Sequence, residues 1–243
     1  MTTTRKAQIR TLLKGIETGD PAAVAVVNPQ TYIQHNPQTH EGGEGLAALF
    51  KRISKSSPRV NIVRTFADGD YIFAHTEYDF ATRRIGFEVF RFEGDYVVEH
   101  WDNIQERKGP NSSGHSMVDG ETEVSDLALT EVNRALATAF VEEVFIEGRT
   151  NRLANYIPEA GYTEHNPEID LADKAATMNY ERVHRVLAEG NFVLTVSEGN
   201  NDDGAGTAFY DLFRIADGKL VEHWDTIEAI APRSEWKNQN GKF

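Results

Sequence analysis

The sequence predicts an α+β fold in which two tandem domains each place helices before a curved antiparallel sheet. Two repeated sequence motifs support this prediction. Residues 32–37, Tyr-Ile-Gln-His-Asn-Pro, return at residues 162–167 as Tyr-Thr-Glu-His-Asn-Pro. Residues 98–104, Val-Glu-His-Trp-Asp-Asn-Ile, return at residues 221–227 as Val-Glu-His-Trp-Asp-Thr-Ile. Because both ends of a unit repeat, a duplicated domain fills nearly the whole chain of 243 residues.

Copy one begins with helices. Four apolar residues at helical spacing predict the first helix: Ile9, Leu12, Leu13 and Ile16. Asp20 and Pro21 are typical of an N-cap and first turn, which predicts a short second helix. A short extended piece is expected at residues 32–35, and a third helix around residues 46–53.

After Pro58 the pattern becomes that of strands. The β-rich runs are residues 60–67, 71–82, 85–92 and 96–105. Asp-Gly-Asp at residues 68–70 and Gly-Asp at residues 94–95 mark turns between them. Helices followed by a meander predict an α+β domain in which the sheet wraps against the helices.

Copy two repeats this order. Its first helix is expected over residues 127–148 and its third helix from Leu171 to about Val183. The last two strands are expected at residues 209–215 and 219–228. The offset between the copies falls by nine after the third helix, so the first strand of copy two is expected to be short.

The expected domain boundaries are residues 1–120 and 126–243. Residues 106–125 are polar and resemble a linker. Residues 111–117 also weakly repeat the pattern of residues 238–243, which leaves open that part of this linker is the ordered tail of copy one.

Composition narrows the class of protein. The net charge is −13 without a basic run, so neither nucleic acid nor an anionic membrane surface is an expected partner. There is no cysteine, which excludes disulfides and thiolate chemistry. No apolar run reaches the roughly 18 residues of a membrane span, and a cytoplasmic location is expected.

Acids and histidines recur on one face of the last two strands. Alternation places His100 and Asp102 together on the last strand, and Glu88 with Phe90 on the preceding one. Their counterparts in copy two are His223, Asp225, Asp211 and Phe213. An acid next to apolar residues on one face predicts a carboxylate at an apolar interior; a solvated edge carboxylate is the other interpretation.

Further candidates come from the first repeated motif, residues 32–37 and 162–167, and from the strand run at residues 71–82. Tyr32 and Tyr162 are expected as core aromatics with a hydroxyl at the rim of a pocket. An Asx turn before proline explains Asn36 and Asn166, but explains the neighbouring His35 and His165 less well. His75 and Phe73 share a strand face, and Val196 stands where copy two would repeat His75.

The chain resembles the SnoaL-like branch of the nuclear-transport-factor-2-like superfamily, which includes polyketide cyclases and predicted aldol-condensation enzymes. The resemblance rests on the Tyr-x-x-His-Asn-Pro start and the Phe-Arg and Val-Glu-His-Trp-Asp finish, and covers residues 5–107 and 131–232. It implies a cone-shaped α+β barrel closed by helices over an apolar pocket.

The resemblance also implies residue roles. Ketosteroid isomerases of the superfamily carry a pocket acid where Glu88 and Asp211 stand. The cyclases use an acid/base aspartate that falls on Asp102 and Asp225. The isomerase base lies near His35 and Asn36, neither of which is an aspartate, so that particular chemistry is not implied.

The leading hypothesis is acid/base catalysis without a cofactor, on a small apolar carbonyl compound, by aldol cyclisation or isomerisation. Burial makes Asp102 a stronger base, and Glu88 beside it separates the two titrations. His35, His75 and His100 are expected to donate to an enolate oxygen or to carry the proton. The absence of His75 from copy two favours copy one as the active copy.

Two other functions stay open. The same pocket could bind a small molecule without converting it. His35, His75, His100 and a carboxylate are also suitable metal ligands, although no HxH or HExxH spacing supports a metal site. The two copies are expected to pair as an intramolecular pseudo-two-fold dimer through outer faces carrying Trp101 and Trp224, giving a monomer in solution.

Overall fold

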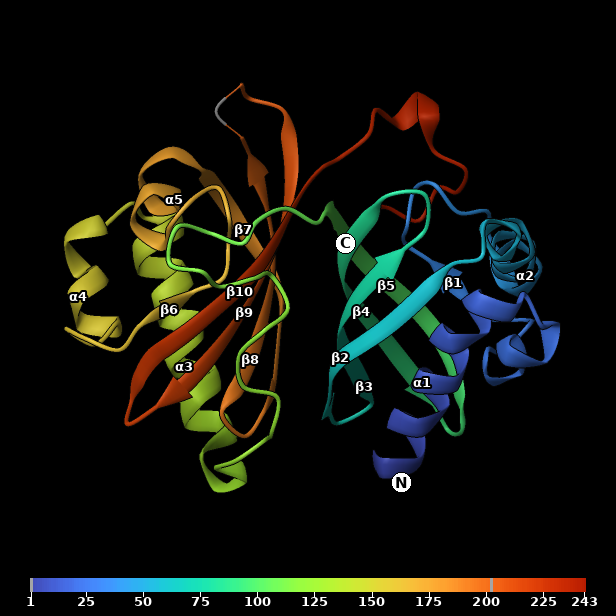
Figure 1. Cartoon of the computed structure of the whole chain (residues 1–243), viewed down its shortest axis with the longest axis horizontal. Coiled ribbons are helices and arrows are strands. Elements are labelled where there is room, and N and C mark those ends of the chain that lie inside the picture. The colour runs from blue at the N-terminus through green and yellow to red at the C-terminus, as the bar shows by residue number, and fades with distance from the viewer. Residues whose placement is uncertain (1, 202) are drawn as a thin grey trace. The chain divides into compact units, whose positions relative to one another are not determined.

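The computed structural model describes residues 2–201 and 203–243. It divides into two compact units (Figure 1). Unit 1 comprises residues up to Glu106 together with Ala231–Phe243, and unit 2 comprises Arg107–Ile230.

Unit 1 begins with the three predicted helices. They are α1 (Thr2–Thr18), the 3₁₀ helix η1 (Pro21–Val26) and α2 (Gly42–Ile53), with a short 3₁₀ turn η2 (Ser54–Ser56) after them. The predicted N-cap is confirmed, because the Asp20 side chain accepts a hydrogen bond from the backbone N–H of Ala22. The predicted apolar stripe of α1 is buried.

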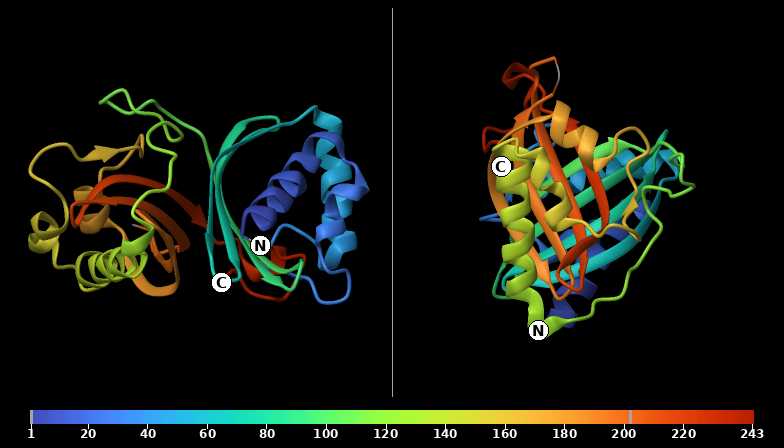
Figure 2. Two further views of the ribbon diagram at one scale, coloured as in Figure 1. Left: turned by 90° about the horizontal axis from the view of Figure 1, so that it is seen from below. Right: turned by 90° about the vertical axis from the view of Figure 1, so that its left-hand side faces the viewer.

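The sheet of unit 1 has the predicted meander. Its strands are β1 (Ile33–Gln34), β2 (Arg59–Asp68), β3 (Tyr71–Asp79), β4 (Arg83–Glu93) and β5 (Tyr96–Glu106). Their order is β1-β5-β4-β3-β2, and β1 pairs parallel to β5. The strands curve around the helices (Figure 2), but β1 and β2 remain edges, so the expected barrel is an open curved sheet.

Unit 2 repeats this architecture. Its helical elements are η3 (Leu127–Leu129), α3 (Thr130–Phe140), the π-helical turn η4 (Val141–Ile146), η5 (Thr150–Arg152), α4 (Leu153–Tyr156) and α5 (Leu171–Thr177). Its strands are β6 (Thr163–Glu164), β7 (Asn179–Glu189), β8 (Phe192–Asn200), β9 (Gly206–Ala216) and β10 (Lys219–Ala229), in the order β6-β10-β9-β8-β7.

The prediction of a short first strand in copy two is wrong, because β7 has 11 residues and β2 has 10. The missing residues come from the preceding helix, where α5 has 7 residues and α2 has 12, and from η2 and the turn after it, which have no counterpart between α5 and β7. Extending the helix to Val183 was therefore wrong: the chain is already a strand at Tyr180, whose buried side chain takes part in the interior described below.

The segment that follows each copy in the chain belongs to the compact unit formed by the other copy. Residues 107–125 belong to unit 2, and residues 231–243, including the 3₁₀ turn η6 (Arg233–Glu235), belong to unit 1. The boundaries expected from chain order, 1–120 and 126–243, differ from the compact units in the placement of these two segments. Backbone contacts hold the last segment in unit 1, as where the N–H of Lys237 donates to the carbonyl of Pro37 at 2.8 Å.

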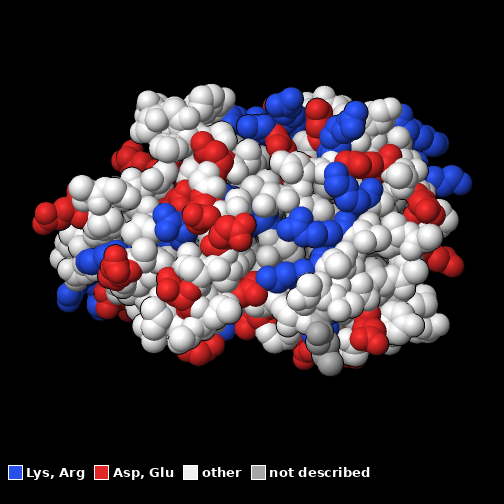
Figure 3. Space-filling view, turned by 60° about the horizontal axis from the view of Figure 1, so that its bottom comes forward, with Lys and Arg blue, Asp and Glu red and all other residues white. Residues whose placement is uncertain are grey.

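Each unit has its own apolar core between sheet and helices. In unit 1 it joins α1 and α2 to the inward residues of β2 to β5, and in unit 2 it joins α3 and η4 to β7 to β10. Acidic and basic side chains lie interspersed on the face shown in Figure 3. Among the described residues, no helix has the length and apolar character needed to cross a bilayer.

Candidate functional site

A cavity of about 140 Å³ lies inside unit 1 between the sheet and helices α1 and α2. Apolar side chains of both helices form most of its wall, including Leu12, Ile16, Leu46 and Phe50. A group of polar residues forms the rest at the sheet: Tyr32, Gln34, Asn36, Tyr78, Glu88, His100 and Asp102.

Strand register explains why these polar groups converge. Glu88 on β4 lies opposite Asp102 on β5, and Phe90 lies opposite His100, so the four share one face. On the other side of β5, Gln34 of β1 pairs with His100. The predicted convergence of Glu88, His100 and Asp102 on one cavity is thus present in the structure.

Glu88 and His100 form a buried hydrogen-bonded pair. Glu88 accepts from the Tyr78 hydroxyl at 2.5 Å and lies 2.7 Å from Nε2 of His100. On the other side of the ring, Nδ1 lies 3.0 Å from Oε1 of Gln34, which also accepts the backbone N–H of Asn36. Because Gln34 Oε1 is an acceptor, Nδ1 of His100 carries the proton that it donates to Gln34.

One carboxylate oxygen of Asp102 accepts no hydrogen bond among the described residues. Its Oδ2 accepts from Nδ2 of Asn36 at 2.6 Å, whereas its buried Oδ1 has no hydrogen-bond partner among the described residues. Nζ of Lys242 lies 3.7 Å from Oδ1 and donates to the Asp102 carbonyl at 2.9 Å. Burial raises the pKa of Asp102, an effect that Lys242 opposes and Glu88 increases.

Tyr32 keeps one proton for a ligand. Its hydroxyl oxygen accepts from Nε2 of Gln34 at 3.1 Å, and within the described chain its own proton has no acceptor. Burial, together with the charges of Asp102 and Glu88, raises the pKa of Tyr32 well above its ordinary value, so the hydroxyl stays protonated. Tyr32 and Asp102 thus both line the cavity, and each has an atom without a hydrogen-bond partner among the described residues.

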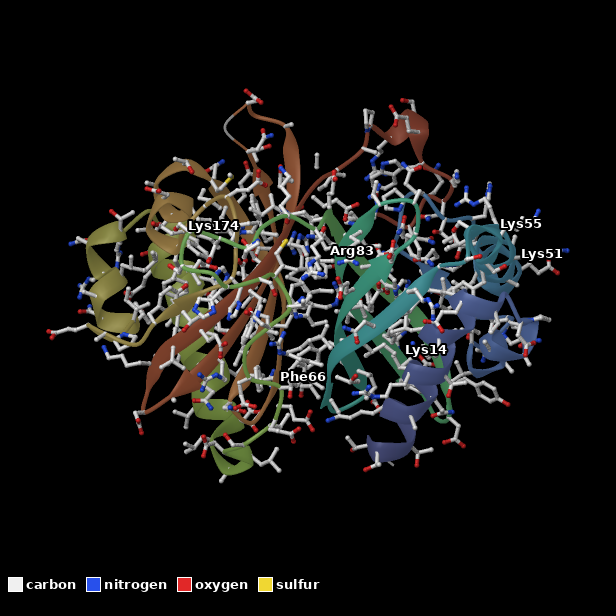
Figure 4. The ribbon with its side chains drawn as sticks, viewed as in Figure 1. Lys14, Lys51, Lys55, Phe66, Arg83 and Lys174 are labelled. Atoms are coloured by element: carbon white, nitrogen blue, oxygen red, sulfur yellow. The ribbon has the colours of Figure 1, made fainter. Side chains whose placement is uncertain are left out.

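In unit 2 the equivalent acids are internally paired. Lys174 lies on α5 (Figure 4). It is 1% exposed and donates to both Asp211 and Asp225, the latter at 2.5 Å. The remaining oxygens accept from Tyr180 at 2.9 Å and Asn166 at 2.8 Å. Every oxygen of the two aspartates is thus engaged, and no counterpart of the available Asp102 oxygen exists among the described residues of unit 2.

Unit 2 has Glu164 where unit 1 has Gln34. This difference alters the hydrogen bonds of the neighbouring tyrosine and histidine. Glu164 accepts the proton of Tyr162 at 2.7 Å and lies 3.0 Å from Nδ1 of His223. Asp211 lies 3.0 Å from the other ring nitrogen. Although burial opposes it, these two carboxylates raise the pKa of His223 to about 10, so this imidazole is a fixed cation.

Other histidines predicted for the pocket lie elsewhere. His35 and His165 stack on Trp101 and Trp224, with ring centroids 4.7 and 4.6 Å apart, and His35 is absent from the cavity wall. The physical reason is alternation: Gln34 faces the cavity, so its neighbour His35 faces the opposite side of the sheet. The prediction that the two tryptophans lie away from the pocket agrees with this placement.

His75 and Phe73 also lie on the face away from the cavity. His75 pairs with Phe87 across the strands, whereas Ala74 pairs with the inward Glu88. His75 stacks on Phe87 with ring centroids 4.5 Å apart, and its Nδ1 lies 2.7 Å from Arg64. The expected metal group of three histidines therefore does not converge.

The remaining predicted binding residues fall into two sets. Tyr32, Asn36 and Phe90 line the cavity, and Phe90 stacks on His100 with ring centroids 4.5 Å apart. Phe213 stacks on His223 at 4.9 Å in the core of unit 2. The Asx turn is present, because Asn36 Oδ1 accepts the N–H of Gln38 at 2.7 Å. The turn does not account for the side-chain nitrogen of Asn36, which donates to Asp102.

Sequence reasoning missed the lysines, the tyrosine partners of the acids, and Gln34. Lys242 and Lys174 each approach the last-strand aspartate but come from a terminal segment and from a helix. Tyr78 and Tyr180 each bind the fourth-strand acid but lie on β3 and β7. A signal existed for Gln34 alone, because it lies between Tyr32 and Asn36 in strand alternation.

No family model and no curated protein matches this chain. Solved structures match in fold. TsrD from Streptomyces laurentii is 19% identical, with a TM-score of 0.37, over 41% of this chain and 86% of that one. An LEH-like epoxide hydrolase of M. tuberculosis is 19% identical, with a TM-score of 0.38, over 43% and 84%. An NTF2-like protein of unknown function from Cytophaga hutchinsonii is 12% identical, with a TM-score of 0.37, over 42% and 89%.

In each comparison about two-fifths of this chain covers more than four-fifths of the other protein. The two five-stranded sheets have equivalent strand orders and each belongs to one copy, so the chain is a tandem duplication of an α+β domain.

Proposed function

We propose that unit 1 catalyses proton transfer next to the carbonyl group of a small, largely apolar compound, without a cofactor. The single observation that carries this proposal is the pairing of an unbonded Asp102 oxygen with the Tyr32 hydroxyl on one wall of an apolar cavity. A base near the α-carbon and a donor near the oxygen are the two groups that enolisation requires.

The reaction follows from these two groups. Asp102 Oδ1 takes the α-proton, and the electron pair of the broken C–H bond moves onto the carbonyl oxygen. The Tyr32 hydroxyl donates to that developing oxyanion. Delivery of a proton from solvent to the same carbon gives exchange, and delivery to another carbon gives isomerisation. Attack of the enolate on a second carbonyl gives aldol cyclisation. The raised pKa of Asp102 favours it as a base for this task.

Cavity size limits the substrate. The volume of about 140 Å³ is close to that of the roughly 150 Å³ engineered cavity that holds benzene. A compound with one ring fits this space. Larger polycyclic compounds require the wall formed by α1 and α2 to move.

The test is deuterium exchange into cyclohexanone and acetophenone in D₂O, followed by NMR. Wild-type protein is expected to exchange the α-protons, Asp102→Asn to lose about a hundredfold or more in rate, and Tyr32→Phe to lose a comparable factor. Equal rates for wild type and Asp102→Asn, with both variants folded by circular dichroism, contradict the proposal.

The same cavity supports a second function, binding without conversion, because its wall is mostly apolar. Saturable shifts of the protein resonances of unit 1 by acetophenone, without deuterium uptake by any compound tested, favour that function. The two outcomes are separated within one set of NMR samples.

A further inference from the structure

Three residues with side chains that can bind metal ions lie close together in unit 2, and they do not include Asp211 or Asp225. His115 and Asp119 lie in the segment 107–125, and His165 follows β6. Nδ1 of His165 lies 2.7 Å from Oδ1 of Asp119, and Nδ1 of His115 lies 3.8 Å from Oδ2 of the same residue. All three donor atoms lie within 4.8 Å of one another.

The hydrogen bonds of His165 direct one ring nitrogen toward this group. Its Nε2 lies 2.9 Å from Oε1 of Glu222, whose other oxygen accepts from Arg214 at 2.6 Å. Because Arg214 forms an ion pair with Glu222, this carboxylate is the acceptor toward His165. Nε2 therefore carries a proton, as in histidines that a carboxylate orients toward a metal.

Nδ1 of His165 then faces acceptors only. The Asp119 carboxylate lies 2.7 Å from it and the carbonyl oxygen of Ser116 lies 2.8 Å from it. In a neutral ring with Nε2 protonated, Nδ1 is a lone pair, and three electron-rich atoms would face one another. A cation between them, either a proton or a metal ion, is required for this arrangement.

We infer that His115, Asp119 and His165 bind a divalent transition-metal ion, with zinc as the best match to two imidazoles and one carboxylate. Metal bonds of about 2.0–2.2 Å at tetrahedral angles place ligand atoms roughly 3.3 Å apart. The observed separations of 2.7 and 3.8 Å lie on either side of this value. Small side-chain rotations of His115 and Asp119, which are 42% and 45% exposed, complete the site.

Unit 1 provides an internal comparison. His35 has the same stacking on a tryptophan and the same bond to a glutamate, Glu99, at 2.9 Å. Its Nδ1, however, lies 3.0 Å from the Gly241 carbonyl, and the segment 231–243 contains neither His nor Asp. Both copies thus share the histidine that stacks on a tryptophan and contacts a glutamate, whereas His115 and Asp119 occur in copy two alone. One metal ion per chain follows.

Calorimetric titration of the EDTA-treated full chain with zinc chloride tests this inference. One zinc ion per chain is expected to bind, and His115→Ala and Asp119→Asn are each expected to weaken binding at least tenfold. His40→Ala, an exposed histidine of unit 1, is the matched control and is expected to leave binding unchanged.

Cobalt titration gives a second measurement. Visible absorption bands of four-coordinate cobalt are expected in wild type and lost in both ligand variants. Absence of zinc binding, two ions per chain, or binding that survives both His115→Ala and Asp119→Asn overturns the inference and assigns the cation to a proton on His165.

Discussion

Gln34 donates a hydrogen bond from Nε2 to the Tyr32 hydroxyl oxygen at 3.1 Å, whereas the equivalent Glu164 accepts the proton of Tyr162 at 2.7 Å. The difference between an amide and a carboxylate at this position thus decides whether the tyrosine hydroxyl accepts a hydrogen bond from its neighbour or donates its proton to it. Together with the available oxygen of Asp102, it makes the two copies unequal in chemistry while they share a fold.

Replacing Gln34 by Glu is expected to give copy one the hydrogen-bonding pattern of copy two. The new carboxylate captures the Tyr32 proton, so deuterium exchange into acetophenone should fall to the level of Tyr32→Phe. The fold should persist, because copy two accommodates glutamate at this position. Gln38→Glu, at an exposed residue of the cavity rim, is the control. Undiminished exchange by Gln34→Glu would refute the assigned role of the Tyr32 proton.

Replacing Lys174 by Met should destabilise unit 2. The change leaves Asp211 and Asp225 buried without their shared cation, and breaking a buried ion pair on one side costs about 3–5 kcal/mol. Lys51→Met provides the control, because Lys51 is exposed on α2 (Figure 4) and should change stability by less than ~0.5 kcal/mol. Urea unfolding measures both; similar small effects would contradict a structural role for Lys174.

The stability of unit 2 should depend on pH through His223. Its pKa rises from 6.5 to about 10 on folding. The folded state therefore binds the proton more tightly, and this stabilisation is complete below pH 6.5 and is lost as pH rises toward 10. Glu164→Gln removes one of the two carboxylates and should flatten this dependence. Urea unfolding at pH values across the interval gives the slope, and identical slopes for the two proteins would count against the assignment.

Lys242 should set the acid limb of the rate profile. The rate falls when Asp102 takes up a proton, and Lys242 holds the pKa of Asp102 down against burial. Lys242→Met should therefore move the acid limb of deuterium exchange to higher pH. Lys237→Met, in the same segment, should leave the limb in place. A limb that does not move in Lys242→Met would show that this lysine does not act on Asp102.

Much of the fold follows from local patterns. The helix stripe of α1, the N-cap at Asp20 and the strand alternation that unites His100 with Asp102 all depend on neighbours in sequence. These signals have fixed periods, so they are readable without a structure. The resemblance added the inward direction of that face, which alternation alone did not decide.

The rest depends on contacts between distant segments. Placing His75 requires the register between β3 and β4, because a shift by one residue turns it to the other face. Lys242 lies 140 residues from Asp102 along the chain and follows copy two. No local period encodes such an approach. His35 was different, since alternation with Gln34 was sufficient to turn it away from the cavity.

The most direct test of the unequal copies compares Asp102→Asn with Asp225→Asn in the deuterium-exchange assay, each checked for folding by circular dichroism. Asp102→Asn is expected to slow exchange by about a hundredfold or more, because it removes the base. Asp225→Asn should remain within about twofold of wild type, because Lys174 already occupies that carboxylate. Equal losses in the two variants, or a larger loss in Asp225→Asn, would contradict the claim that copy one carries the chemistry.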